Sequence, residues 1–328
     1  MSENAKKPPS RTPPTGEDTS RSLPVAASRD RERAGATPQP YFTDPAGRFI
    51  LYQGDCLELM PQLPAGSFDL IFADPPYFLS NGGITCHAGK MVSVNKGRWD
   101  RSMGFAGNYA FTKEWIARCQ RLLKPNGSIF VSGTSHIIHV VGAVMDELGL
   151  KVLNDITWVK PNPPPNLSCR YFTHAAETIL WAGRDKKTRH KFNYQLMKRI
   201  AGGKQMKSVW TDIDAPRRDE KVFGKHPTQK PLGLLERIIA AASDENDLIL
   251  DPFSGSATTG IAAARMNRRS VGLEMEEEFL ELSKKRFQHD FVEAGYSPLL
   301  DYERQTNADT SKQKNAAGKV SSRLFGNA

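Results

Sequence analysis

The C-terminal third of the chain contains the feature that most constrains the fold. The apolar run Leu248–Leu250 predicts a buried strand, and the turn Asp251–Ser256 leads into a helix over about residues 257–266. A second strand over 270–273 ends at Glu274. A strand, a glycine-containing turn, a helix and a strand ending in an acid are the order of elements in a nucleoside-binding unit. This order predicts an α/β protein.

The turn and the acid indicate what kind of ligand such a unit binds. Small residues at Gly255 and Ser256 let the backbone approach a ligand, and Glu274 is placed to accept hydrogen bonds from two ribose hydroxyls. The turn lacks G-x-G-x-x-G and a Walker lysine, so pyrophosphate and triphosphate are poorly supported. Asp251 suits a cationic group such as an ammonium, and Phe253 is placed to pack on a base. A nucleoside carrying an amino acid indicates S-adenosylmethionine, although the turn alone would be interpreted as a packing turn.

A second motif, Asp74-Pro75-Pro76-Tyr77, follows the apolar run Leu70–Ala73, which predicts a short buried strand. Pro75 biases Asp74 toward extended geometry, and both prolines stiffen the chain. The motif therefore offers a carboxylate, a carbonyl at Pro75 and an aromatic face at Tyr77. This arrangement predicts a binding site for a planar group that carries an amino group.

Composition limits the partners and the compartment. The chain of 328 residues is 39% hydrophobic, enough for one large core, and its net charge of +9 makes nucleic acid the first partner to consider. The four cysteines show no C-x-x-C spacing, and His136 and His139 lack a third ligand, so we expect neither zinc nor another metal. Without an 18-residue apolar run or a signal-peptide core, we expect a cytoplasmic protein that does not enter a membrane.

Composition also divides the chain. We expect residues 1–38 to form a disordered basic tail and residues 39–300 to form one folded domain. We expect residues 301–328 to form a disordered C-terminal tail. Within the domain, 78–107 predicts a mobile loop and the basic stretch 160–225 an insertion that recognises the target. A solvated charged face is the alternative for that stretch. The candidates for DNA contact are Lys90, Lys96, Arg98, Asn166, Arg170, Arg184, Lys187, Arg189 and Lys207.

Three motifs together resemble the amino-methyltransferases that act on DNA. They are Asp74–Tyr77, His226–Pro231 and Asp251–Gly260, and the likeness spans about residues 41–291. The catalytic motif precedes the cofactor motif, as in the circularly permuted β class. The resemblance implies the class I S-adenosylmethionine-dependent methyltransferase fold, a Rossmann-like mixed sheet of seven strands with helices on both faces. Its last strand is antiparallel, and the chain enters the sheet near the third strand.

The resemblance also implies roles for individual residues. Asp74 and the carbonyl of Pro75 would accept the two N–H bonds of an adenine amino group, Pro76 would stiffen the motif, and Tyr77 would stack on a base flipped out of the duplex. Two acceptors favour a pyramidal nitrogen whose lone pair faces the methyl group of the sulfonium. We interpret Asp74 as an acceptor first and a proton relay at most.

For the cofactor, the resemblance assigns Asp55 and Cys56 to the edge of its adenine, Phe253 to the ring face and Glu274 to the ribose. Thr228, Gln229 and Lys230 would meet the methionine carboxylate. The residues expected to line the cofactor site are Asp55, Cys56, Asp74, Thr228, Gln229, Lys230, Asp251, Phe253, Gly255, Ser256, Thr258 and Glu274. One departure is Ala257, where the family usually has glycine, which adds a methyl group near the cofactor.

Three further stretches narrow the likeness to one branch. Phe78–Gly83, Ser93–Gly97 and Asn166–His174 look most like the GATC adenine methyltransferases of the Dpn restriction system, which also accept single-stranded DNA. Enzymes that modify GANTC share much of this frame, but those of the cell-cycle type carry a longer C-terminal domain that residues 302–328 do not resemble. The alternatives are GANTC specificity, an N4-cytosine enzyme, an RNA methyltransferase and a non-catalytic DNA-binding module. A homodimer and a companion restriction endonuclease are left open.

Overall fold

The structure is a computed structural model. It describes residues 38–80, 84–87, 90–93, 100–163, 165–166, 168–224 and 226–325, with side chains up to residue 312 except in 81–99. The tail predicted at 1–38 lies outside the described residues except for Pro38, and so do residues 81–83, 88–89 and 94–99 of the loop predicted at 78–107. The described part of that loop is not without regular structure, because it contains the antiparallel pair 84–87 and 90–93 and the start of a helix at Gly104.

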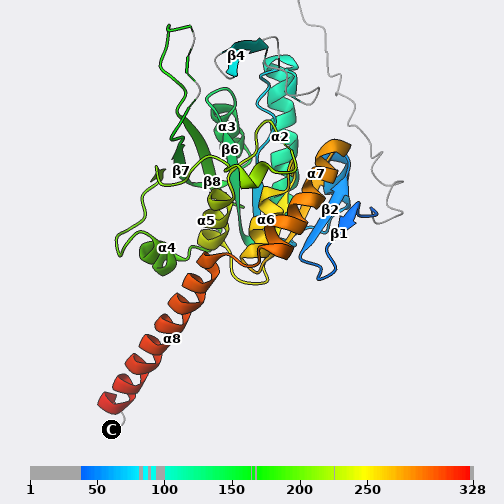
Figure 1. Cartoon of the computed structure of the whole chain (residues 1–328). Coiled ribbons are helices and arrows are strands. Elements are labelled where there is room, and N and C mark those ends of the chain that lie inside the picture. The colour runs from blue at the N-terminus through cyan, green and yellow to red at the C-terminus, as the bar shows by residue number, and fades with distance from the viewer. Residues whose placement is uncertain are drawn as a thin grey trace, which may run out of the picture. The chain divides into compact units, whose positions relative to one another are not determined.

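The strands and helices alternate along most of the chain (Figure 1). The strands are β1 (Phe42–Thr43), β2 (Phe49–Gln53), β3 (Phe68–Ala73), β4 (Ile84–His87), β5 (Lys90–Ser93), β6 (Leu123–Gly133), β7 (Lys151–Val159), β8 (Ala176–Gly183), β9 (Val209–Trp210), β10 (Leu248–Asp251) and β11 (Arg269–Glu274). The helices are α1 (Cys56–Leu59), α2 (Gly104–Leu122), α3 (Ile138–Glu147), α4 (Tyr194–Ile200), α5 (Leu232–Ala242), α6 (Thr258–Arg265), α7 (Glu277–Phe287) and α8 (Pro298–Phe325). No helix of the described residues is long and apolar enough to cross a membrane.

The main sheet has nine strands in the order β1-β2-β11-β10-β3-β6-β8-β7-β9. The five strands from β2 to β6 in this order are mutually parallel, and β8 runs antiparallel to both of its neighbours, β6 and β7. Seven strands, from β2 to β7 in sheet order, therefore form the predicted mixed sheet, and the short β1 and β9 extend its two edges. The predicted fold class is confirmed.

The central strands are buried on both faces, as a parallel sheet between two helical layers requires. In β3, Leu70 and Phe72 pack in one hydrophobic cluster with α5 and α6. The alternating residues Ile71 and Ala73 pack in a second cluster with α2 and α3. The side chains of a strand point alternately to opposite faces, so the two clusters are the two sides of one sheet.

The parallel strands place their carboxyl ends at one edge of the sheet. Asp251 at the end of β10 pairs with Gly272, and Glu274 at the end of β11 pairs with Gln53 of β2. Asp74 follows the last residue of β3 directly. Ligands of open α/β sheets bind beyond this edge, so the fold brings both predicted motifs to one place.

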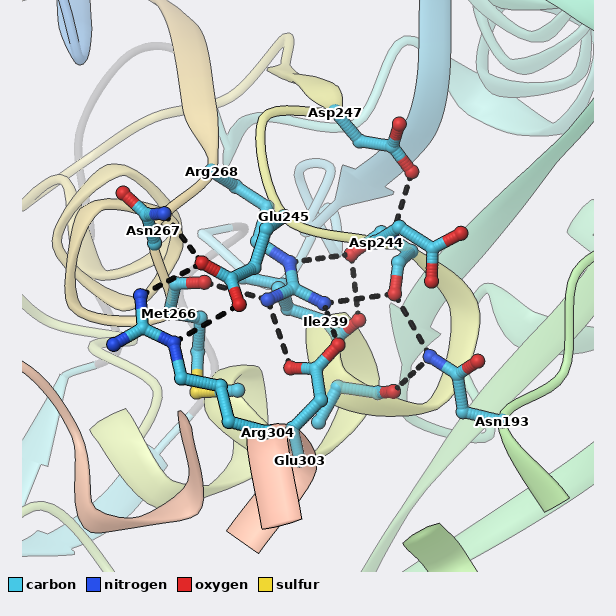
Figure 2. A network of polar contacts seen from close by, with 12 residues as sticks. Asn193, Ile239, Asp244, Glu245, Asp247, Met266, Asn267, Arg268, Glu303 and Arg304 are labelled. Carbon is cyan, nitrogen blue, oxygen red and sulfur yellow. Dashed lines mark hydrogen bonds and ion pairs between the residues drawn. The ribbon is translucent and has the colours of Figure 1, made fainter. Parts of the chain in front are cut away.

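The disordered tail predicted from Asp301 is wrong for the residues that α8 contains. Arg268, just before β11, makes a bidentate ion pair with Glu303, with both N–O distances at 2.8 Å and both side chains at most 3% exposed (Figure 2). Arg304 pairs with Glu245 beside it. Two buried charges need each other as partners, so this network fixes the first turns of a helix whose composition is polar.

Candidate active site

Asp74 is a carboxylate held on both oxygens. Its Oδ2 accepts a hydrogen bond from Lys230 Nζ at 2.6 Å, and its Oδ1 accepts one from the Tyr77 hydroxyl at 2.7 Å. The side chain is 12% exposed. Burial raises the pKa of Asp74 above its ordinary range, and the positive charge of Lys230 opposes that rise. Asp74 is therefore a fixed, largely dry acceptor whose charge Lys230 balances.

Glu177 in β8 completes this charge cluster, and the sequence analysis missed it. Its carboxylate lies 3.4 Å from Lys230 and 2.5 Å from Lys160. Burial by itself would raise the pKa of Glu177, but the two lysines outweigh it and lower the pKa to about 2. The Ser132 hydroxyl lies between Glu177, at 3.5 Å, and the Tyr77 hydroxyl, at 3.3 Å. The only sequence signal was an acid at the start of an otherwise apolar strand.

Tyr77 does not present the open stacking face that was predicted. The residue is 5% exposed, and Lys230 Nζ lies over its ring, 5.5 Å from the centroid. Stacking of a base on Tyr77 therefore requires Lys230 to leave that position, and the role stays a prediction.

Asp100 holds the chain that follows the motif. Its Oδ1 accepts the backbone N–H of Tyr77 at 2.9 Å, and its Oδ2 accepts the N–H of Leu79 at 3.1 Å and the Ser80 hydroxyl at 2.9 Å. Asp100 is fully buried. Between these anchors Phe78 has a φ of +56°, a conformation that a bulky residue adopts only when its surroundings impose it. Asp100 was missed because it lies in the aperiodic loop at 78–107.

Two carboxylates of the cofactor motif are short of positive partners. Burial, helped by the negative charges of Asp74 and Glu274, raises the pKa of Asp251 to about 7. Burial likewise raises the pKa of Glu274 to about 7, although its oxygens accept three backbone N–H groups, including that of Gly255 at 2.7 Å. Three acids with raised pKa at one edge suit a cationic ligand, and so these residues fit the predicted cofactor.

The turn itself is shaped by close packing. Gly255 has a φ of +51°, and a Cβ there would lie 3.0 Å from His226 Nε2. The glycine therefore lets the turn pack directly against the His226–Pro231 motif. Phe253 is held by the edge of Trp115, with ring centroids 5.4 Å apart and the planes at 90°. This geometry supports Phe253 as a platform for a base.

The side-chain hydroxyls of Ser256 and Thr258 are engaged within the protein, and the predicted contact of these residues with the cofactor stays a prediction. Both are buried, and each hydroxyl accepts a hydrogen bond from Arg286 Nη1 at 3.0 Å. They hold the start of α6 against α7. Ala257 is also fully buried, and its methyl group belongs to the core cluster of α5 and α6. The departure from glycine at 257 therefore affects the backbone, which has a left-handed φ of +59°, and not the space for the cofactor.

The remaining cofactor candidates lie beside these acids. Asp55 caps α1 by accepting the Leu57 N–H at 2.8 Å, and the N–H of Gly54 bonds to the Glu274 carbonyl at 2.9 Å. Cys56 is buried, and burial raises the pKa of its thiol to about 12.

In the His226–Pro231 motif, the Thr228 hydroxyl lies 3.3 Å from His226 Nδ1. Gln229 Nε2 donates to the Glu220 carbonyl at 2.9 Å, and its buried Oε1 has no hydrogen-bond partner among the described residues. Lys230 lies against Asp74 and Glu177, so its predicted contact with the methionine carboxylate stays a prediction.

Comparison with known proteins identifies the family of this chain. A family model described as DNA methylase, N6_N4_Mtase, matches residues 68–285, which include all three motifs. The chain belongs to the N6/N4 DNA methylase family. It is 54% identical over 249 residues to the type II methyltransferase M2.MboI of Moraxella bovis, covering 76% of this chain and 91% of the relative. It is 51% identical over 251 residues to M2.DpnII of Streptococcus pneumoniae, covering 76% and 92%.

Solved structures agree with this assignment. The complex of M1.HpyAVI with SAM is 30% identical, with a TM-score of 0.55 over 73% of this chain and 98% of that one. The cytosine-N4-specific PvuII DNA methyltransferase is 21% identical, with a TM-score of 0.60 over 82% of this chain and 95% of that one. The second likeness shows the fold alone.

In this N6/N4 methylase, the described residues among the candidates for DNA contact lie at different edges of the main sheet. The stretch 160–225 is not a single insertion, because β8 within it is a strand of the main sheet. Since β8 ends at Gly183, opposite Lys151 at the start of β7, the chain after it lies at the amino edge, away from Asp74. The candidates placed there are Arg184, Lys187 and Arg189.

The other DNA candidates of the methylase are distributed as follows. Asn166 and Arg170 lie in the connection from β7 to β8 at the carboxyl edge, and Lys207 precedes the short β9 at the end of the sheet. Asn166 uses both ends of its amide within its own loop, so it supports the loop's shape. Lys90 is described only by its backbone in β5, and Lys96 and Arg98 lie outside the described residues.

Proposed function

We propose that this chain is a site-specific DNA methyltransferase that transfers a methyl group from S-adenosylmethionine to the N6 amino group of adenine in GATC. The observation that carries the proposal is the juxtaposition at one sheet edge of a buried acceptor, Asp74, and an acid-rich, glycine-containing turn. Acting on DNA, such an enzyme belongs in the cytoplasm.

The acids of the turn support the cofactor. S-adenosylmethionine supplies an electrophilic methyl group on a positively charged sulfur, and it also carries an ammonium. Asp251 is placed to bind the ammonium, and Glu274 to accept from the ribose hydroxyls. Phe253, braced by Trp115, offers a face to the cofactor's adenine. The solved complex of the 30% identical M1.HpyAVI with SAM is consistent with this assignment.

Asp74 supports an exocyclic amino group as the acceptor of the methyl group. The lone pair of that nitrogen is delocalised into the base, so it is a weak nucleophile until two acceptors orient its N–H bonds. The Asp74 carboxylate and the Pro75 carbonyl are such acceptors at adjacent positions. When the N–CH₃ bond forms, the S–CH₃ electron pair returns to sulfur and the nitrogen loses a proton. Burial raises the pKa of Asp74, which makes it a better acceptor for this proton.

The burial of this site supports base flipping. A carboxylate that is 12% exposed is out of reach for a base stacked in a duplex, so the target has to leave the stack. Lys230 and the Tyr77 hydroxyl hold Asp74 until the amino group takes the place of one of them.

The resemblance to the Dpn enzymes and the 51–54% identity to M2.DpnII and M2.MboI support adenine in GATC. N4-cytosine enzymes usually have serine where Asp74 stands, which disfavours that alternative. The relatives are type II methyltransferases, so a companion restriction endonuclease is part of the proposal. Action on single strands and a homodimer stay predictions from the resemblance.

The test is expression in a bacterial host that lacks adenine methylation, followed by sequencing of its DNA for modified bases. The proposal predicts N6-methyladenine in GATC and its loss with Asp74→Ala. The control is Asp146→Ala, which removes a carboxylate that is 80% exposed. Methylated cytosine, or adenine methylation in an unrelated sequence, would overturn the corresponding part of the proposal.

A further inference from the structure

The connection from β7 to β8 begins and ends beside the charge cluster of Asp74, Lys230 and Glu177. The Lys160 N–H bonds to the Ala175 carbonyl at 2.7 Å, and the Lys160 side chain pairs with Glu177 at 2.5 Å. Glu177 in turn lies 3.4 Å from Lys230, which holds Asp74. The two ends of this loop are therefore fixed beside the Asp74 charge cluster.

The tip of the loop has a defined internal structure. Asn166 Oδ1 accepts the backbone N–H of Ser168 at 3.1 Å and its hydroxyl at 2.7 Å, and Asn166 Nδ2 donates to the Tyr171 carbonyl at 2.7 Å. The Tyr171 ring lies 5.6 Å from the ring of His174, which lies 6.2 Å from that of His136 at the end of β6. Hydrogen bonds and ring contacts together orient the tip.

This supported tip carries Phe172 in the open. Phe172 is 95% exposed, more than any other large apolar side chain of the described residues, and Tyr171 beside it is 61% exposed. The exposed ring of Phe172 adds nothing to the core, so its role is more readily explained by contact with a binding partner. The exposed Arg170 lies two residues before it. Proteins that distort DNA insert such apolar side chains between base steps.

We propose that Phe172 enters the DNA stack next to the target and fills the space that the flipped adenine vacates, while Arg170 contacts a neighbouring phosphate. The inference rests on the proposed function and adds a residue that makes the target accessible. DNA is favoured over a protein partner because the ring is only five positions along the chain from Glu177 in the Asp74 charge cluster and because the chain has a net charge of +9.

The test compares Phe172→Ala with the wild type on one duplex and on the single strand that carries the target, using the site found by sequencing. We expect kcat/KM on the duplex to fall by about 10–100-fold, the range for loss of one aromatic–base stack. On the single strand, where no stack has to be opened, kcat/KM should stay within about threefold. Phe172→Trp should restore duplex activity.

A binding assay isolates the flipping step. A duplex with 2-aminopurine at the target position should become fluorescent when the wild type binds and should stay dark with Phe172→Ala. The matched control is Tyr302→Ala, which removes a ring that is 47% exposed in α8, a helix anchored at the amino edge by Glu303. It should behave as the wild type in both assays.

Equal losses on duplex and single strand, or an undiminished 2-aminopurine signal with Phe172→Ala, would overturn the inference. Unchanged duplex activity would also overturn it and would leave a protein partner as the occupant of the tip. If the wild type acts only on duplex, the fluorescence comparison decides. Failure of the proposed function is distinguishable, because the wild type itself would then leave DNA adenine unmethylated.

Discussion

Replacing Asp251 by asparagine should stabilise the folded chain by an amount that grows as pH rises from about 5 to about 8. Burial raises the pKa of Asp251 from an ordinary value of 3.8 to about 7. An acid with a raised pKa in the folded state binds its proton more tightly there than in the unfolded chain. The free energy of unfolding of the wild type therefore falls as pH rises from 3.8 to about 7, and the loss is complete above that.

The size of the effect follows from the shift. About three pKa units at 1.36 kcal/mol each correspond to roughly 4 kcal/mol, an upper value for a fully buried group. Asparagine carries no charge, so its free energy of unfolding relative to the wild type should rise by roughly that amount between about pH 4 and about pH 8. The weakened hydrogen bond from Thr259 subtracts about 1 kcal/mol at every pH and does not change the slope.

The assay is urea unfolding of both proteins at about five pH values between 4.5 and 8, without cofactor. Asp146→Asn, at a side chain that is 80% exposed, is the control and should differ from the wild type by the same small amount at every pH. Isothermal titration with S-adenosylmethionine should show the opposite order, with the tighter binding in the wild type above about pH 7. A pH-independent difference between Asp251→Asn and the wild type, or an advantage that shrinks as pH rises, would refute the reasoning.

Three further changes test other parts of the structure. Glu303→Ala leaves Arg268 buried and unpaired and should lower the free energy of unfolding in urea by about 3–5 kcal/mol, whereas adding Arg268→Met should recover most of it; a loss below about 1 kcal/mol would contradict the anchoring of α8. Asp100→Ala frees the chain after the catalytic motif and should lower kcat by about 10–100-fold while cofactor affinity by titration stays unchanged; a selective loss of cofactor affinity would contradict this role. Glu177→Gln removes a charge that raises the pKa of Asp74, so the acid limb of the kcat/KM profile should move to lower pH, and a shift to higher pH would count against the cluster.

The sequence predicted those residues of the candidate site that are marked by short-range patterns. Asp74, Asp251 and Glu274 each stand at the end of an apolar strand, and the carboxyl ends of parallel strands meet at one edge. The order of elements around residues 248–274 was sufficient to predict the α/β fold.

The residues that were missed act across long distances in the chain. Asp100 and Glu177 reach the catalytic motif from a loop and from β8, and Arg286 reaches the turn before α6 from α7. No local pattern marks such residues, because only the folded sheet brings them together.

Composition could not place two segments in the fold. The basic run that contains Arg184 and Arg189 was interpreted as a DNA surface; the direction of β8 places it at the amino edge, and its contact with DNA stays a prediction. The polar residues after Asp301 were interpreted as disorder, but the pair of Arg268 with Glu303 anchors them. A charge pattern shows that a segment is solvated and does not show which edge of the fold it occupies.

The most direct test of the central claim is nucleoside analysis of DNA methylated in vitro with labelled S-adenosylmethionine by the wild type and by Asp74→Ala. We predict label in N6-methyldeoxyadenosine with the wild type and none with the variant, whose cofactor affinity should persist. Label in N4-methyldeoxycytidine, or undiminished adenine methylation by Asp74→Ala, would contradict the account.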